Sequence, residues 1–251
     1  MEKFIQEISK KAGKIILEKF GKVDIEKTKA HSLDIVTEAD LASNKFLLKN
    51  IIENFPTHGI ISEETGEYRK NTEYTWIIDP LDGTINFSKK IPLFAVLVCL
   101  VKKGTLELAS IYDPVHEELF YAKRGKGTYL NNKLVRCSNQ KNILHSLGCF
   151  TDRLKQDRLK ILNNISNSVK ESFSISSLLS IGLTSAYVAS ARRDWFVSDG
   201  GKVWDYASSA LILKESGCVV TNFQGKPWSF NDRNIIACNK YLHSKLLKLI
   251  N

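Results

Sequence analysis

Two aspartates stand three residues apart after an apolar run, in the segment WIIDPLDGTINF at residues 76–87. The residues before Asp79 read as a strand, and the turn after them should bring Asp82 back to the same side. Two carboxylates so close repel each other unless they are protonated or neutralised, and oxygen ligands favour a hard cation such as Mg²⁺. A helix beginning at Gly83 and Thr84 would offer free N–H groups to an anion. The segment therefore predicts a metal ion beside a phosphate, although Asp-Pro and Asp-Gly also form ordinary turns.

Other acidic residues occur at comparable positions. Glu63 and Glu64 follow a short apolar strand in ISEETG, and Asp205 stands at the start of an amphipathic helix in KVWDYASSALILKESG. Asp40 lies three residues after Thr37, which is a capping-box arrangement. Loop positions and helix capping explain these acids as well as ligand binding does, so each one alone is ambiguous.

The motifs taken together carry a family resemblance. DIVTEAD, ISEETG, WIIDPLDGTINF and VWDYASSALILKESG occur in this order over most of the chain. The set resembles the inositol monophosphatase family of Mg²⁺-dependent, lithium-sensitive phosphatases, and its DPLDGT element is highly specific. The ending GTINF is more similar to the inositol phosphatase branch than to the branch that acts on 3′-phosphoadenosine nucleotides. The resemblance implies a layered α/β/α/β/α sugar-phosphatase fold, two or three Mg²⁺ ions and a homodimer.

The resemblance also implies roles at the matching positions. One metal ion would be bound by Glu63, Asp79 and the backbone carbonyl of Leu81. A second ion would be bound by Asp79, Asp82 and Asp205. Glu63 would also help to bind a weaker third ion.

The same resemblance implies how the reaction proceeds. A metal-bound water near Glu63 and Thr84 would be the nucleophile, with Asp40 tuning Thr84 through a hydrogen bond. Metal ions about 3.5–4 Å apart can activate this water and neutralise the phosphoryl charge, so neither a cysteine nor a serine nucleophile is required. The resemblance places these residues at the phosphate and substrate: Gly83, Thr84, Ser180, Asp199 and Asp205.

Substrate choice should depend on the residues around the leaving alcohol, where the sequence departs from the animal enzymes of the family. Those enzymes place a glutamate seven residues before the WD aspartate, and here that position is Ser198, with Asp199 beside it. Leu179 stands where a glycine is expected, and Ser180 supplies the hydroxyl. Lys29 matches a family lysine near the phosphate, or is an ordinary solvated lysine. Inositol 1-phosphate is the expected substrate, with fructose 1,6-bisphosphate, NADP and histidinol phosphate as alternatives.

An α+β chain must position these residues. Apolar spacing predicts helices at 2–20 and 37–55. Strands and a hairpin are then predicted in a mixed, largely antiparallel sheet, at 59–62, 75–79, 93–101, 106–112, 118–122 and 128–135. Later strands at 143–150, 194–197, 218–222 and 234–239 alternate with helices at 152–168, 178–191, 204–216 and 240–250. We expect an N-terminal half, 1–141, with most metal ligands, a C-terminal α/β half, 142–251, and the site at their junction.

The composition fits a normal globular protein. The chain has 251 residues, and its longest apolar run, Leu93 to Val101, is too short to span a bilayer. Five cysteines without CxxC spacing and an N-terminus unlike a signal peptide predict a cytoplasmic protein. The net charge of +9 admits a second class of function, a regulatory protein that binds RNA or a protein partner. Because the lysines are scattered, we expect a small phosphorylated metabolite as the partner, in preference to nucleic acid, and no membrane association.

Overall fold

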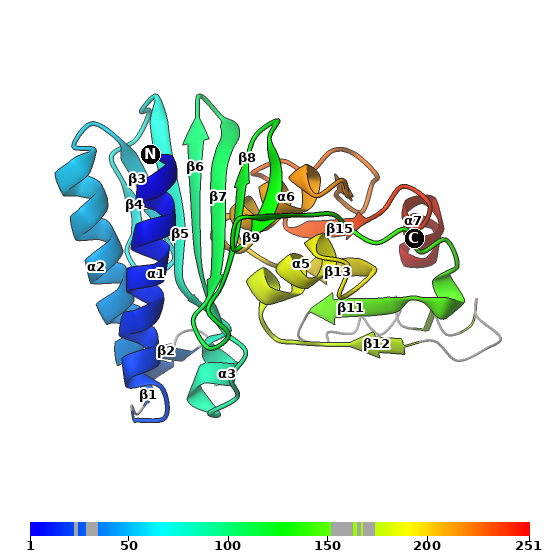
Figure 1. The fold of residues 1–251 in the computed structure, drawn as a ribbon, viewed down its shortest axis with the longest axis horizontal. Helices are drawn as coiled ribbons and strands as arrows, with labels where there is room; N and C mark the ends of the chain where they lie inside the picture. The colour runs from blue at the N-terminus through cyan, green and yellow to red at the C-terminus, as the bar shows by residue number, and fades with distance from the viewer. Residues whose placement is uncertain (23–24, 29–34, 152–162, 165–166, 168–173) are drawn as a thin grey trace.

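The computed structural model describes residues 1–22, 25–28, 35–151, 163–164, 167 and 174–251. Its elements stack in five layers, in the order helix, sheet, helix, sheet, helix (Figure 1). The two main sheets have eight and five strands, which run vertically and horizontally, respectively, in Figure 1. The predicted layered, mixed α/β fold is confirmed. The division of the chain at residue 141 stays a prediction.

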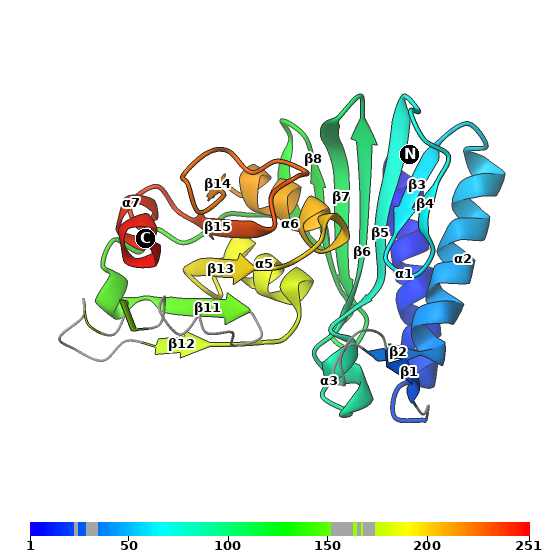
Figure 2. The ribbon, with the colours of Figure 1, turned by 180° about the vertical axis from the view of Figure 1, so that it is seen from behind.

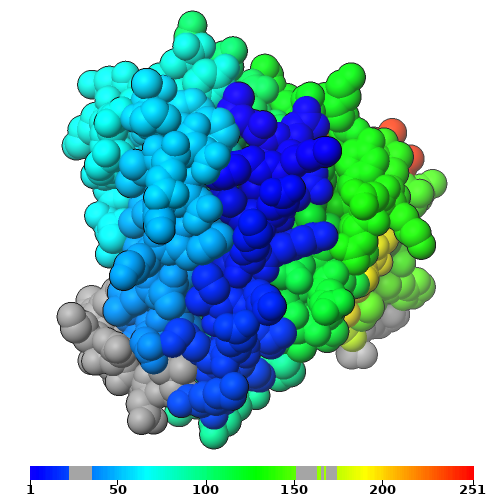
Figure 3. All heavy atoms as spheres, turned by 60° about the vertical axis from the view of Figure 1, so that its left-hand side comes forward, coloured from blue at the N-terminus to red at the C-terminus, as the bar shows by residue number. Residues whose placement is uncertain are grey.

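Two long helices form the first outer layer, α1 (Glu2–Lys19) and α2 (Glu38–Asn54). They lie side by side on the surface of the molecule (Figure 3) and cover one face of the large sheet. In α1, Ile5, Ile8, Ala12 and Ile16 are buried, and their spacing of three or four residues places them on one face of the helix. Both helices agree with their predicted ranges to within one residue.

The large sheet has the strand order β10-β9-β8-β7-β6-β5-β3-β4, in which only β3 and β5 are parallel neighbours. Its strands are β3 (Gly59–Ser62), β4 (Gly66–Tyr68), β5 (Tyr74–Asp82), β6 (Ala95–Lys102), β7 (Thr105–Asp113), β8 (Glu118–Lys123), β9 (Gly127–Leu130) and β10 (Lys133–Val135). Helices cover both faces of β6, which explains its unbroken apolar run. The predicted strands are confirmed. The helix considered at Gly83 and Thr84 is present as the short α3 (Thr84–Ser88), whereas β4 and the separate hairpin of β1 (Ile25–Thr28) and β2 (Ile35–Thr37) were not predicted.

The middle layer consists of α5 (Ile181–Ala189) and α6 (Val203–Glu215), which lie between the two sheets (Figure 2). In α6 every residue from Tyr206 to Leu213 is buried, because both sides of the helix are covered. One apolar core joins the helices to both sheets and includes Leu97, Leu211 and Ile235. The ends of α5 and α6 are therefore held firmly against the large sheet.

The small sheet has the strand order β12-β11-β13-β15-β14, and α7 (His243–Ile250) packs on its outer face (Figure 2). Its strands are β11 (Leu147–Thr151), β12 (Ser174–Ser176), β13 (Trp195–Asp199), β14 (Val219–Thr221) and β15 (Asn234–Cys238). The strand predicted at 143–150 is wrong in its first part, where a 3₁₀ turn, η1 (Ile143–His145), forms instead. The helix predicted at 152–168 lies mostly outside the described residues. Among the helices of the described chain, none has the length and apolar character needed to cross a membrane.

Candidate active site

Asp79 and Asp82 lie at the end of β5, on the same face of the large sheet. Asp79 pairs with Leu97 of β6, and Asp82 pairs with Ala95 of the same strand. Asp82 is three residues after Asp79 on β5, whereas Ala95 is only two residues from Leu97 on β6. The extra residue forms a β-bulge, without which residues three apart would point to opposite faces. Both aspartates are buried, with 1% and 6% of their surfaces exposed. The predicted juxtaposition is present, and the bulge produces it.

The N-terminus of α5 holds the Asp82 carboxylate. The hydroxyl of Ser180 and the N–H of Gly182 (2.8 Å) donate to one oxygen, and the N–H of Ile181 donates to the other at 3.0 Å. Burial raises the pKa of Asp82 to about 6, and these three hydrogen bonds limit the rise because they favour the charged form. The structure thus places Ser180 on Asp82, and its predicted contact with substrate stays a prediction.

Gly182 allows α5 to approach this carboxylate closely. A Cβ on Gly182 would lie 2.6 Å from Cδ1 of Leu97 and 2.9 Å from Oδ2 of Asp82. We expect Gly182→Ala to displace the end of α5 and to lower the free energy of unfolding by about 1–3 kcal/mol. Because Asp82 would lose its orientation, we also expect Mg²⁺ to bind about 10-fold or more weakly, as a titration would measure.

A glycine far from the site provides the control for this variant. Gly104 has a φ of 74° and open space around its Cβ position, so Gly104→Ala introduces backbone strain without a contact in the site. It should lower stability and leave Mg²⁺ affinity unchanged. Equal Mg²⁺ affinity in both variants would show that the contact between α5 and Asp82 is unimportant for the metal.

Asp40, in the first turn of α2, lies between Thr37 and Thr84. The Thr84 hydroxyl is 3.2 Å from Oδ1 of Asp40 and 2.9 Å from the carbonyl oxygen of Leu81, while the N–H and hydroxyl of Thr37 donate to Oδ2. Burial raises the pKa of Asp40 to about 7, and the charges of nearby glutamates add to the rise. The structure shows both contacts that the sequence predicts for Asp40. Its catalytic role stays a prediction.

Glu63 and Asp205 reach the same region from two other elements. Glu63 follows β3, which runs parallel to β5, and its N–H donates to the carbonyl of Ile78 at 3.3 Å. Asp205 lies in the first turn of α6 and accepts the N–H of Lys202. Burial and then the charge of Glu63 raise the pKa of Asp205 to about 8. The carboxyl ends of parallel strands and a helix N-terminus thus bring these acids together.

Asp79 lies at the centre of this acidic cluster. Burial raises its pKa well above its ordinary value, and four neighbouring acids raise it further, in the order Glu63, Asp82, Asp205 and Asp40. Buried carboxylates so close together must be protonated or neutralised by a cation, and an all-oxygen donor set suits Mg²⁺.

The side chains of these acids do not converge on one point as the ligands of a bound metal ion do. Within the described residues, no three Asp, Glu, His or Cys side chains are arranged as ligands of one ion. Asp82 and Asp205 are each turned toward backbone N–H groups of a helix. A carboxylate has about four lone-pair positions, so these hydrogen bonds leave room for a metal on both residues. In donor chemistry and electrostatics the cluster therefore fits Mg²⁺.

Gly83 and Thr84 lie where β5 passes into α3. Gly83 has a φ of 89°, and a Cβ there would lie 2.8 Å from the carbonyl oxygen of Leu93. Only glycine fits both this conformation and this close approach. The N–H groups that begin a helix have no partner within it. Their predicted contact with the phosphate stays a prediction.

The position of the expected glutamate is part of the core. The hydroxyl of Ser198 is buried and lies 2.9 Å from that of Tyr206. Asp199 is the next residue of β13, so its side chain points to the opposite side, and it is partly exposed. Leu179 is 43% exposed, with a φ of 50°. Lys29 lies outside the described residues.

Two polar residues of α2 brace the site and were not singled out from the sequence. Ser43 donates to the carbonyl of Pro80 at 2.9 Å, and the side chain of Ser62 donates to that of Asn44 at 2.7 Å. Both lie one turn after Asp40, on the buried face of α2. Polar residues on the inward face of an otherwise apolar helix were the signal that could have identified them.

Comparisons with known proteins identify the family of this chain. A profile of the inositol monophosphatase family matches residues 1–251. The chain belongs to the inositol monophosphatase family. It is 35% identical to the Nus factor SuhB of Salmonella typhimurium over 235 residues, which cover 92% of this chain and 88% of that protein. It is 32% identical to the fructose-1,6-bisphosphatase/inositol-1-monophosphatase of Thermotoga maritima over 251 residues, with coverage of 99% and 94%.

Solved structures of inositol monophosphatases (IMPases) share the fold. A Thermotoga maritima IMPase superposes with a TM-score of 0.91 at 31% identity, covering 99% of this chain and 96% of that one. An IMPase/NADP phosphatase complexed with Mg²⁺ and phosphate has a TM-score of 0.85 at 24% identity, with coverage of 96% and 91%. The second similarity establishes the fold alone, and it shows an IMPase-like protein with Mg²⁺ bound.

Proposed function

We propose that this protein is a Mg²⁺-dependent phosphomonoesterase that hydrolyses a small sugar or polyol phosphate. The observation that carries the proposal is the buried acidic cluster, in which Glu63, Asp82 and Asp205 raise the pKa of Asp79. Such a cluster destabilises a fold unless it binds a cation, because Asp79 and Asp82 are buried away from water and the neighbouring acids repel their charges. Membership of the family and the Mg²⁺ and phosphate bound by the IMPase/NADP phosphatase support the proposal.

In the proposed site, Mg²⁺ ions would be bound by residues at the end of β5 and by residues of two neighbouring elements. When bound, Mg²⁺ supplies an activated water and neutralises charge on the phosphoryl oxygens. The ligands would be Glu63, Asp79, Asp82, Asp205 and the carbonyl of Leu81, with Glu63 also serving a third ion. Asp82 is oriented for this role by its hydrogen bonds to α5.

Thr84, Asp40 and Glu63 orient the attacking water in this proposal. The Thr84 hydroxyl lies within hydrogen-bond distance of both Asp40 and the carbonyl of Leu81. Its single hydrogen can serve only one acceptor at a time. When that hydrogen is donated to Asp40, the Thr84 oxygen accepts a hydrogen bond from the water and turns a water lone pair toward phosphorus. The phosphate oxygens accept hydrogen bonds from the backbone N–H groups of Gly83 and Thr84.

We propose inositol 1-phosphate as the substrate. Ser198 cannot contact the leaving alcohol because its hydroxyl is buried against Tyr206. We therefore propose that Asp199 accepts hydrogen bonds from the sugar hydroxyls. The relative named fructose-1,6-bisphosphatase/inositol-1-monophosphatase makes fructose 1,6-bisphosphate the first alternative, ahead of NADP and histidinol phosphate. A homodimer, inhibition by lithium and a cytoplasmic location are further parts of the proposal.

Phosphate release by the purified protein tests this function. We expect turnover of at least one of the four phosphate esters in Mg²⁺ and none in EDTA, with activity restored by added Mg²⁺. The ratio of kcat/KM values for inositol 1-phosphate and fructose 1,6-bisphosphate then identifies the preferred alcohol. Folded protein that hydrolyses none of the four, and does not hydrolyse p-nitrophenyl phosphate either, would overturn the proposal.

A further inference from the structure

Two stretches of the chain contain many cations and no acid. Residues 119–151 contain six lysines and arginines, and residues 233–251 contain four more, without one Asp or Glu in either stretch. The stretches are more than 80 residues apart in the sequence. Lys123 and Arg124 pair with Glu2 and Glu107, so the cations that require an explanation are those at 136–141 and 240–248.

The structure joins the two stretches at one end of the molecule. The side chain of Asn239 donates to the carbonyls of Ser138 and Gln140 at 2.9 and 2.8 Å, and Lys245 donates to the carbonyl of Lys141 at 2.8 Å. These bonds tie the segment after β10 to the turn between β15 and α7. We call the exposed residues around this junction the basic face: Arg136, Lys141, Lys240, Tyr241, Lys245 and Lys248.

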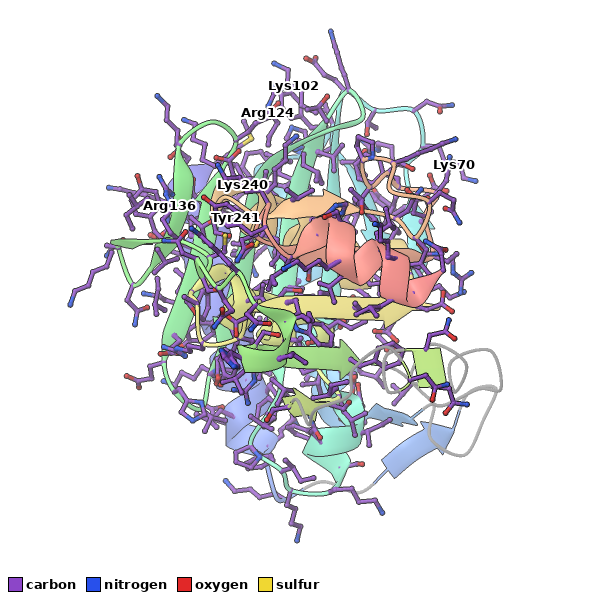
Figure 4. All side chains as sticks on the ribbon, turned by 90° about the vertical axis from the view of Figure 1, so that its right-hand side faces the viewer. Lys70, Lys102, Arg124, Arg136, Lys240 and Tyr241 are labelled. Atoms are coloured by element: carbon purple, nitrogen blue, oxygen red, sulfur yellow. The ribbon has the colours of Figure 1, made fainter. Side chains whose placement is uncertain are left out.

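An exposed aromatic ring lies within this face. Tyr241 is 41% exposed, and the Lys141 and Lys240 ammonium groups lie 4.9 and 5.2 Å from the centre of its ring. Figure 4 shows Arg136, Lys240 and Tyr241 close together in front of the large sheet. The lysine side chains are long and flexible, so they can turn from the ring toward a ligand.

Two acids that hydrogen-bond to residues 125–147 are engaged within the fold. Glu215 accepts the N–H groups of Gly125 and Gly127, each at 2.9 Å. Asp194 accepts the Ser138 hydroxyl and the N–H of Leu147. Both carboxylates are therefore oriented toward N–H and hydroxyl groups of the fold.

We propose that the basic face binds single-stranded nucleic acid, with Lys141, Lys240 and Arg136 on the phosphates and a base stacked on Tyr241. A row of cations beside an exposed aromatic ring matches a chain of phosphates and planar bases. An anionic membrane would be matched by the charges alone, and Tyr241 would then be dispensable for binding. The proposal is independent of the phosphatase, since the face contains no residue of the acidic cluster.

Fluorescence anisotropy with a labelled oligouridylate of about 16 nucleotides tests the proposal. We expect a Kd of roughly 1–100 μM that weakens steeply with salt. The double variant Lys141→Gln, Lys240→Gln should reduce the slope of log K against log salt by about 1.4, which corresponds to two lost phosphate contacts. Tyr241→Ala should weaken binding about fivefold or more through the lost stacking.

Two lysines elsewhere on the surface serve as matched controls. Lys70 and Lys102 pair with Glu67 and Glu73 at 3.2 and 3.7 Å, and both lie away from Tyr241 in Figure 4. The double variant Lys70→Gln, Lys102→Gln removes the same net charge and should bind the oligonucleotide nearly as the parent does. Equal losses in the two double variants would overturn the proposal, as would binding to phosphatidylserine vesicles that is tighter than RNA binding and unaffected by Tyr241→Ala. Mg²⁺-dependent hydrolysis should be unchanged in all these variants.

Discussion

Asp79→Asn is expected to reduce Mg²⁺-dependent phosphate release by about 10³-fold or more and to raise the melting temperature of the metal-free protein. Activity falls because a metal ligand contributes several kcal/mol of transition-state stabilisation, and each 1.36 kcal/mol is tenfold in rate. Stability rises because Asp79 is buried among four acids that repel its charge. A relief of about 1 kcal/mol corresponds to roughly 2–4 °C for a chain of this size.

The hydrogen bonds of Asp79 explain why the fold should survive. One carboxylate oxygen accepts the N–H of Leu81 at 3.1 Å, and an asparagine oxygen can accept the same bond. Asp113 offers a matched control, since it is fully buried, accepts the N–H groups of Val115 and His116, and is not among the acids that raise the pKa of Asp79. Asp113→Asn should retain Mg²⁺-dependent turnover without the gain in stability.

Phosphate-release assays and thermal unfolding in EDTA measure the two effects separately. Loss of activity together with a gain in stability is expected of a metal ligand whose charge is repelled by neighbouring carboxylates. If Asp79→Asn keeps full activity, the assignment of the site is wrong. If it loses activity and stability together, Asp79 is a structural residue and the metal lies elsewhere.

The sequence predicted which acids meet, and the reason is local. Asp79 and Asp82 belong to one short motif, and Glu63 and Asp205 follow a strand end and begin a helix, positions where a fold delivers side chains to a ligand. The sequence did not show how Asp82 comes to lie on the same face of the sheet as Asp79. A bulge between β5 and β6 does this, and bulges depend on the partner strand as much as on the strand that carries them.

The errors also have physical causes. The segment 143–150 was predicted as one strand, but the side chain of Asn142 accepts the N–H of Leu144 and starts a 3₁₀ turn. Ser198 was predicted only to replace the expected glutamate, and its partner, Tyr206, which lies on another element eight residues later, could not be identified. Such side-chain partners are decided by tertiary packing, which periodicity does not report.

The metal-free protein is expected to lose stability as the pH rises from about 4 to about 8. Burial raises the pKa of Asp82 to about 6, of Asp40 to about 7 and of Asp205 to about 8, all from an ordinary value of 3.8. The folded state therefore binds more protons than the unfolded state across this range, and the free energy of unfolding falls as those protons are lost. Each unit of pKa difference corresponds to 1.36 kcal/mol, so Asp82 alone, whose pKa differs by about two units, contributes a fall of about 3 kcal/mol.

Bound Mg²⁺ should reverse this trend, because it neutralises the same carboxylates that protons neutralise in its absence. At about 100 times its Kd, a ligand specific for the folded state adds about 2.7 kcal/mol. Since protons compete with the metal at low pH, the stabilisation by Mg²⁺ should be small near pH 5 and large near pH 8. Urea unfolding at both pH values, in EDTA and in Mg²⁺, measures the difference. If stability in EDTA rises with pH, the charges of the acidic cluster do not destabilise the fold. If Mg²⁺ stabilises the protein equally at both pH values, the metal does not bind to the acidic cluster.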